Sequence, residues 1–214
     1  MHELTFAAAA LMLCVAAGSY LAGCCNGAII TSFLFYKDDI RKYGSHNAGL
    51  TNFYRVYGGK FAVCVILVDM LKAFVAVKLG SVVFDAYLGL RLEGEYFSAL
   101  FCVIGHIFPA FYSFKGGKGI LCSGTLLLLL DWRIAAVGWG LFALLWLTTR
   151  YVSLGSVSGA ASFPITTLIF FRSNWTVFVL SLLIAALVIW EHRENIGRLL
   201  HGTESRFRWH TDAP

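Results

Sequence analysis

Residues 4–36 form one unbroken run without a charged side chain. A helix needs about 20 apolar residues to cross a bilayer, so this run is long enough to span one with residues to spare. The basic region that opens a secretory signal is missing before it, so we predict a retained helix. The whole chain shares the bias, because 58% of its 214 residues are hydrophobic and 14% are charged. This composition excludes an ordinary soluble domain.

Six further apolar segments follow the first one. They cover residues 60–78, 96–114, 119–130, 134–149, 151–171 and 173–190. No composition shift or internal repeat divides the chain, so residues 1–214 are expected to form a single domain. The sequence therefore predicts an all-α polytopic membrane protein with seven transmembrane helices.

Lysine and arginine residues are distributed unequally between the loops on the two sides of these spans. Twelve of them fall in residues 37–60, in 115–118, at Arg150 and in the tail after 190, against four in the alternate loops. Positively charged loops stay in the cytoplasm. We therefore predict an outside N-terminus and a cytoplasmic C-terminus.

The net charge of +5 is explained by the same bias, so no nucleic-acid partner is expected. The six cysteines lie mostly in apolar runs and show no CxxC spacing. They predict neither a disulfide framework nor a zinc site. No carboxylate cluster suggests a magnesium site, and we expect neither a metal ion nor a cofactor.

Two features of the spans are unusual. Residues 119–130 would extend only about 18 Å as a helix, far less than a hydrocarbon core of about 30 Å. The loop before them is then recessed, or the span is partly irregular backbone covered by protein. In the second span, Asp69 and Lys72 lie one helical turn apart. This pair is either functional or a mutually neutralising structural pair.

The dense polar clusters all fall on the predicted cytoplasmic side. Loop 37–60 contains hydroxyls, amides, glycines and a guanidinium, groups that together suit phosphate binding. A solvated loop attracted to anionic lipid is the alternative. The candidate site residues in this loop are Ser45, Asn47, Gly49, Thr51, Asn52 and Arg55.

A glycine run flanked by lysines opens the fourth predicted span. It reads Lys115-Gly116-Gly117-Lys118-Gly119. Free N–H groups, the positive helix end and two ammonium groups would together hold a phosphate. The spacing is not that of a Walker A loop, so nucleotide hydrolysis is not predicted. His106, just upstream, suits either this site or packing at the interface.

Two polar repeats with a spacing of three residues complete the set. Arg150, Ser153 and Ser156 are expected to share one helical face at the cytoplasmic mouth of a span. Serines in such helices often bond only the backbone, but the arginine favours a polar site. The second repeat is His192, Asn195 and Arg198, where cations alone would merely stabilise a helix C-terminus.

Taken together, five motifs resemble the bacterial PlsY family of membrane acyltransferases. They are residues 41–55, Asp69 with Lys72, residues 105–109 with 114–119, residues 150–156 and residues 192–198. The resemblance covers nearly the whole chain in the same order. It implies transfer of a fatty acyl group from acyl phosphate to the sn-1 hydroxyl of glycerol 3-phosphate, which gives lysophosphatidic acid and phosphate. This is the first acylation of phospholipid synthesis.

The resemblance also implies roles for individual residues. Catalytic roles fall to Ser45, Arg55, Lys115, Lys118, His192 and Asn195, and Glu204 matches a structural glutamate. It implies a bacterial inner-membrane enzyme that faces the cytoplasm and uses two phosphate-bearing substrates. No general base is expected; a phosphate oxygen of the substrate would take the proton. Functional coupling to the enzyme that produces acyl phosphate is left open.

The chain departs from the family pattern at several positions. Gly23-Cys-Cys-Asn26 replaces Gly-Ser-Ile-Pro, His46 and Ala73 replace glycines, and Ile120-Leu-Cys122 replaces a smaller run ending in Thr. These changes bear on substrate preference. A small organic-phosphate or anion transporter is the alternative function, although the polar clusters lie on one side and no inverted repeat is visible.

Overall fold

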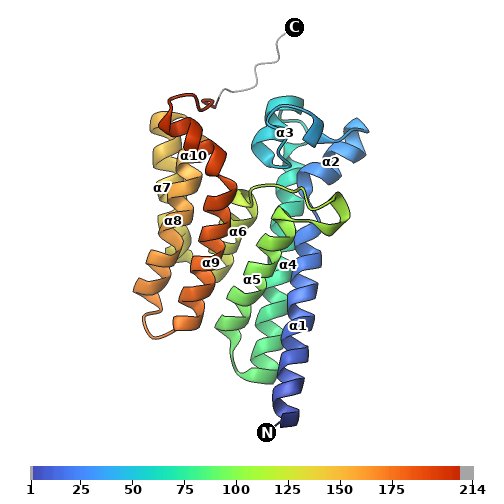
Figure 1. Cartoon of the computed structure of the whole chain (residues 1–214), viewed down its shortest axis with the longest axis vertical. Coiled ribbons are helices and arrows are strands. Elements are labelled where there is room, and N and C mark those ends of the chain that lie inside the picture. Colours follow the sequence, from blue (N-terminus) through green and yellow to red (C-terminus); the bar gives the residue numbers. More distant parts are fainter. Residues whose placement is uncertain (1, 208–214) are drawn as a thin grey trace.

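The computed structural model describes residues 2–207, and regular structure within them is entirely helical (Figure 1). The α-helices are α1 (His2–Cys24), α2 (Gly27–Tyr36), α3 (Leu50–Tyr57), α4 (Ala62–Leu88), α5 (Arg91–Ile107), α6 (Ile120–Leu130), α7 (Trp132–Thr149), α8 (Val152–Phe170), α9 (Trp175–Glu191) and α10 (Arg193–Leu200). Short 3-10 turns cover Ile40–Lys42 and Ala110–Tyr112. Arg208, counted above with the tail, lies outside the described residues.

The first predicted span is broken into α1 and α2. Asn26 lies at the break, where its Oδ1 accepts a hydrogen bond from the N–H of Ile29 at 3.0 Å and so caps α2. Its Nδ2 donates to the carbonyl of Ala48 at 3.0 Å. A buried asparagine can therefore interrupt the helix because its amide replaces the missing backbone bonds.

Helix α4 is longer than the predicted segment 60–78 and continues for ten residues beyond Lys78. The predicted segment ended at Lys78, although residues 79–84 beyond it are again mostly apolar. Four charged residues lie within the helix: Asp69, Lys72, Lys78 and Asp85. Asp69 and Lys72 form a buried ion pair at 2.7 Å, which lets the helix carry them through the protein interior.

Four helical segments are long and apolar enough to cross a membrane, namely Phe6–Tyr36, Arg91–Tyr112, α7 and α8. A fifth is added if α9 and α10, which are bent by 59°, count as one span. The seven-span prediction also needs α4, which is long but carries more charge, and α6, which has only 11 residues. The number seven and the orientation of the termini therefore stay predictions.

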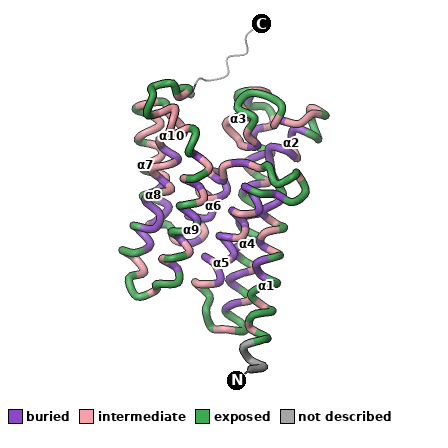
Figure 2. The backbone as a smooth tube through the Cα atoms, viewed as in Figure 1, coloured by how far each residue is buried: buried purple, intermediate pink, exposed green. Residues whose placement is uncertain are grey.

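The helices pack in two groups. Helices α1, α4 and α5 pack against one another, and α6, α7, α8 and α9 form the second group (Figure 1). Contacts of α5 with α9 and of α4 with α6 join them. The largest cluster of buried residues lies along this junction, with Tyr96, Val103, Leu126 and Ile184 among its members. Figure 2 shows the buried positions gathered on the inner faces of these helices.

The connection between α5 and α6 crosses from one group to the other. In Figure 1 it lies deeper in the molecule than the ends of α3 and α10. Because α6 begins at this depth, its 11 residues start well below the end of the bundle. Of the two alternatives for this short span, the structure favours a recessed loop.

Candidate functional site

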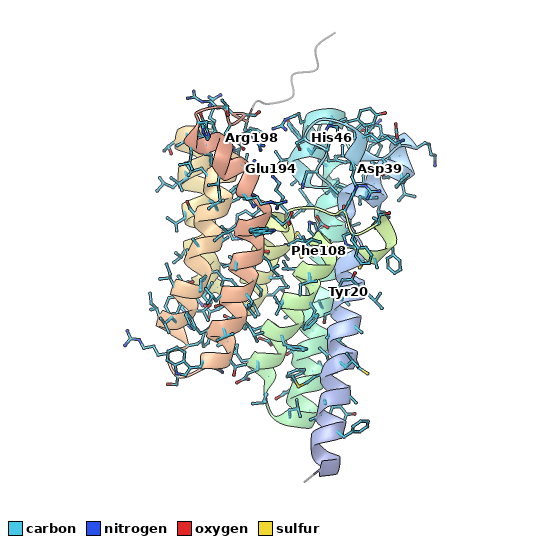
Figure 3. The ribbon with its side chains drawn as sticks, in the orientation of Figure 1. Tyr20, Asp39, His46, Phe108, Glu194 and Arg198 are labelled. Atoms are coloured by element: carbon cyan, nitrogen blue, oxygen red, sulfur yellow. The ribbon has the colours of Figure 1, made fainter. Side chains whose placement is uncertain are left out.

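The predicted polar segments gather at one end of the molecule, opposite the start of α1. Helix α3, helix α10 and the loop before α6 all lie toward this end (Figure 1). In Figure 3, His46 lies on the α3 side and Arg198 and Glu194 lie on α10. Residues separated by more than a hundred positions in the sequence are therefore brought to the same region.

Asn52 holds the loop 43–48 in shape. Its Oδ1 accepts the N–H of Ser45 at 2.8 Å, and its Nδ2 donates to the carbonyls of Tyr43 and Asn47, both at 3.0 Å. The residue is only 3% exposed. The prediction placed Asn52 among the substrate contacts, but its amide is occupied by the backbone, as is the carbonyl of Asn47.

The loop before α6 is joined to loop 43–48. The N–H of Ala48 donates to the carbonyl of Gly116 at 3.4 Å, and Arg41 donates to the carbonyls of Tyr112 and Lys115 at 2.7 and 3.1 Å. The two predicted phosphate-binding segments are therefore parts of one structure. Lys115 itself is exposed and lies at the edge of this structure.

The glycine run does not offer all the free N–H groups that the sequence suggested. Gly116 and Gly117 donate to the carbonyls of Ile107 and His106 at 3.0 and 3.2 Å. In the described loop before α6 and the first turn of that helix, by contrast, the N–H groups of residues 118–121 donate to no protein acceptor. A phosphate would thus be held by the start of α6, whose free N–H groups and positive helix end attract anions.

Gly117 is required by close packing. A Cβ built there would lie 2.4 Å from His106 Nε2 and 2.6 Å from the carbonyl oxygen of Ala48. The imidazole of His106 accepts from Lys72 Nζ through Nδ1 at 2.6 Å, while the same ammonium bonds Asp69 and the carbonyl of Cys25. This network links the Asp69–Lys72 pair to the loop, which supports the structural interpretation of that pair.

Glu204 organises the opposite side of the site. It is 51 residues from Ser153 in sequence, yet its Oε1 accepts from Ser153 Oγ at 2.7 Å and from Asn195 Nδ2 at 2.6 Å. Its Oε2 accepts from Arg198 Nε at 2.7 Å. Asn195 Oδ1 in turn accepts from Lys118 Nζ. One carboxylate thereby connects α8, α10 and the loop before α6.

The charges in this cluster influence one another. Burial and the nearby Arg198 guanidinium lower the pKa of Lys118 below its ordinary value. Burial acts to raise the pKa of Glu204, but hydrogen bonds from Asn195, Ser153 and Arg198 outweigh it and lower that pKa. Glu204 is therefore ionised at neutral pH and offsets part of the positive charge.

His192 lies in the turn between α9 and α10. Its Nδ1 is 2.7 Å from the carbonyl oxygen of Val188, which can only accept, so Nδ1 carries the proton. Burial lowers its pKa to about 4. The ring is therefore neutral at pH 7, and Nε2 presents a lone pair. Because the bend of 59° follows this residue, Asn195 and Arg198 lie on α10 rather than on a continued α9.

The repeat 150–153–156 is not one helical face. Arg150 ends α7 with a positive φ of 63°, and α8 begins only at Val152. The turn could not be predicted from the sequence, because arginine rarely adopts the left-handed backbone conformation seen at Arg150. Ser153 joins Glu204, whereas Ser156 Oγ donates to its own helix at the carbonyl of Val152, 2.8 Å away.

A polar pocket of about 620 Å³ lies between α3 and the tail after α10. Its walls include Thr51, Tyr54 and Arg55 of α3, together with Tyr151, Glu204 and Arg206. Thr51 and Arg55 were predicted site residues, while Tyr151 and Arg206 were not singled out. Glu204 borders both this pocket and the Lys118–Asn195 contact, so the two regions adjoin.

An apolar cavity lies on the other side of the polar cluster, among α6, α7, α8 and α9. Its walls are almost entirely apolar and include Trp139, Phe142 and Phe163, with Ser156 among the few polar residues. Sequence patterns could not reveal this cavity, because it depends on how four apolar helices pack. The described residues contain no cluster of three or more His, Cys, Asp or Glu side chains suited to a metal ion.

The chain was compared with known protein families, curated proteins and solved structures. A family model described as glycerol-3-phosphate acyltransferase matches residues 13–202. A glycerol-3-phosphate acyltransferase of Finegoldia magna is 42% identical over 87% of this chain and 91% of that protein. A glycerol-3-phosphate acyltransferase of Thermoanaerobacter pseudethanolicus is 39% identical over 91% of this chain and 94% of that protein.

The fold agrees as well. A crystal structure of PlsY, an integral membrane glycerol 3-phosphate acyltransferase, in its glycerol 3-phosphate form has a TM-score of 0.79 with this chain. The two are 32% identical, over 92% of this chain and 96% of that one. The chain belongs to the PlsY family. The lysophosphatidic acid form of PlsY is also similar, with a TM-score of 0.77 and 30% identity. The family resemblance of the sequence motifs is thus confirmed, and its site residues can be assigned to proposed roles.

Proposed function

We propose that this chain transfers a fatty acyl group from acyl phosphate to the sn-1 hydroxyl of glycerol 3-phosphate. The products would be lysophosphatidic acid and inorganic phosphate. One observation carries the proposal: Glu204 lines the polar pocket and also bonds Ser153 and Asn195, next to Lys118. The apolar cavity begins on the other side of these residues. Such an arrangement fits one soluble and one greasy phosphate-bearing substrate.

Glycerol 3-phosphate fits the polar pocket. The Arg55 guanidinium can bind a phosphate with two hydrogen bonds, and Thr51 adds a hydroxyl on the same short helix. Ser45 lies in the loop before α3, where its N–H is bonded to Asn52. From this loop it would contact or orient the same substrate. Asn52 and Asn47 then act by shaping the loop, and Gly49 is the N-cap residue of α3.

The phosphate of the acyl donor fits the start of α6. There Lys118 and the free N–H groups of residues 118–121 face the anion, and Lys115 adds a second positive charge. The acyl chain would occupy the apolar cavity that begins beside Ile120 and Ser156. Keeping the chain there avoids a cost of about 0.8 kcal/mol for each CH₂ exposed to water.

The reaction needs no covalent acyl-enzyme, because acyl phosphate is already activated. The hydroxyl oxygen of glycerol 3-phosphate attacks the carbonyl carbon, and a new C–O ester bond forms as the bond from that carbon to the phosphate oxygen breaks. The hydroxyl proton passes to a phosphate oxygen of the substrate. His192, whose pKa of about 4 makes it a weak base, would orient the substrate and would not take this proton.

Positioning and charge stabilisation would supply most of the rate. Lys118 would stabilise the negative charge that develops on the carbonyl oxygen or the leaving phosphate. Asn195 holds Lys118, and Glu204 holds Asn195. This chain of contacts gives a physical reason for the catalytic assignment of Asn195 and the structural assignment of Glu204.

The test is an assay of purified protein with palmitoyl phosphate and glycerol 3-phosphate, in which phosphate release and lysophosphatidic acid are measured together. We expect equal amounts of both products, and none when palmitoyl-CoA replaces the donor. Transfer from palmitoyl-CoA alone would refute the donor assignment. Absence of lysophosphatidic acid with either donor would refute the enzyme and favour transport of an organic phosphate.

The site is proposed to face the cytoplasm from a bacterial inner membrane. The twelve-to-four distribution of Lys and Arg supports this orientation. Single cysteines introduced at positions 93 and 118 provide the test in intact cells. An impermeant thiol reagent should modify position 93 and leave position 118 unmodified, and the opposite result would reverse the topology.

A further inference from the structure

The apolar cavity is narrow and partly open to the outside of the bundle, with a volume of about 50 Å³, and its lining residues show where its two ends lie. On α8 its lining runs from Gly155 to Phe163, and these two residues lie about 12 Å apart along the helix axis. Ser156 lies one turn from Ser153, which bonds Glu204, so the upper end adjoins the polar cluster. Leu127, Trp139 and Phe163 lie toward the other end.

Trp139 is held firmly in the wall of this cavity. Its Nε1 donates to the carbonyl of Gly124 at 3.0 Å, which ties α7 to α6. Its ring packs edge-on against Phe142, with ring centroids 5.7 Å apart and an interplanar angle of 76°. An indole fixed by a hydrogen bond and an aromatic contact cannot turn aside at low cost.

Gly124 permits this position of the ring. A Cβ at residue 124 would lie 2.6 Å from Cζ2 of Trp139. The glycine therefore allows the indole to lie directly against α6 and to narrow the space between the two helices. A flexible side chain in place of the tryptophan would leave the lower part of the cavity open.

We propose that Trp139 limits the length of the acyl chain that the enzyme accepts. This role rests on the proposed function, because it assumes that the cavity holds the acyl chain of the donor. A chain that enters beside Ser156 meets the fixed indole before it can extend to the far side of the bundle. Longer chains must then bend toward the lipid, where they lose contact with the cavity.

The chain-length profile of turnover tests the role. Acyl phosphates of 12, 14, 16, 18 and 20 carbons would be compared in the full chain and in Trp139→Leu, which opens the lower cavity. We expect kcat/KM of the variant to shift in favour of longer donors, by up to about fourfold for each additional CH₂ accommodated. Trp175→Leu is the matched control, because Trp175 is 67% exposed and should leave the profile unchanged.

A second variant tests the same claim in the opposite direction. Ala160 also lines the cavity, so Ala160→Leu should fill it and shift the preference toward shorter donors. This variant keeps the test decisive if Trp139→Leu fails to fold. Activity in the wild type with an unchanged profile in the folded variants would overturn the role of Trp139 alone. Absence of wild-type activity with every acyl phosphate would instead refute the proposed function and this role with it.

Discussion

Ser153 of α8 donates a hydrogen bond to Glu204, a residue 51 positions later, at 2.7 Å. Asn195 donates to the same carboxylate oxygen at 2.6 Å. Arg198 completes the set at the other oxygen. The alignment of Asn195, and through it of Lys118, therefore depends on a single carboxylate that need not touch the substrate.

Replacement of Glu204 by Gln should destabilise the protein and lower activity together. The amide cannot replace the charged acceptor in its bonds to Arg198, Asn195 and Ser153, and one charged hydrogen bond is worth about 1.5–3 kcal/mol. We expect the unfolding temperature in detergent to fall by several degrees. The control is Glu194→Gln, because the side chain of Glu194 is 75% exposed; an equal loss in both variants would contradict the organising role of Glu204.

The positive side chains of the site should contribute to substrate binding rather than to folding. Arg55→Ala and Lys115→Ala each remove a charge-assisted contact worth about 1.5–3 kcal/mol, so kcat/KM should fall about ten- to a hundredfold. Lys60→Ala removes an exposed lysine outside the site and serves as control. If folded Arg55→Ala or Lys115→Ala kept normal turnover and both normal Michaelis constants, the assigned contact would be wrong.

A methyl group at Gly117 should disturb the loop before α6. The added Cβ would meet His106 Nε2 and the Ala48 carbonyl at distances that atoms do not adopt without movement. Gly117→Ala is therefore expected to raise the Michaelis constant for a phosphate-bearing substrate and to lower the unfolding temperature. Gly197→Ala is the matched change, because a Cβ there meets no atom within 4 Å. Equal behaviour of the two variants would show that the close packing at Gly117 has no consequence.

Acidification should weaken the fold through His192. Its pKa is lowered to about 4 in the folded protein, against about 6.5 for an unperturbed histidine. Between these values the unfolded chain binds more protons, so stability falls as the pH falls from about 6.5 to about 4. Thermal unfolding across this range measures the effect. His192→Asn keeps a donor for Val188 without titrating, and its unfolding temperature should depend less on pH; an identical dependence would refute the assignment.

Much of this architecture could be predicted from the sequence. Hydropathy located segments that became α1 with α2, α5, α6, α7, α8 and α9, because long apolar runs have few alternatives to helix in a membrane. The short segment 119–130 and the Lys115–Gly119 loop were recognised as unusual from length and composition alone. The family motifs named residues that the fold does bring to one end of the molecule.

Other features depend on contacts that no local pattern encodes. The break at Asn26 exists because its amide finds Ala48, 22 residues away. Arg150 does not share a helical face with Ser153 and Ser156, because it forms a left-handed turn at the end of α7. The bonds of the Asn52 amide to the backbone of loop 43–48 could not be predicted, because an exposed and a buried asparagine look alike in sequence. The apolar cavity and the place of Trp139 in it required the packing of four helices.

The central claim is that the Arg55 pocket, the start of α6 and the apolar cavity form one active site. A structure of the protein with glycerol 3-phosphate and a non-transferable acyl phosphonate would test it most directly. The account predicts the glycerol phosphate beside Arg55, the phosphonate at Lys118, and the acyl chain between Ser156 and Trp139. Both headgroups bound away from Arg55 and Lys118, or an acyl chain lying outside α6 to α9, would contradict it.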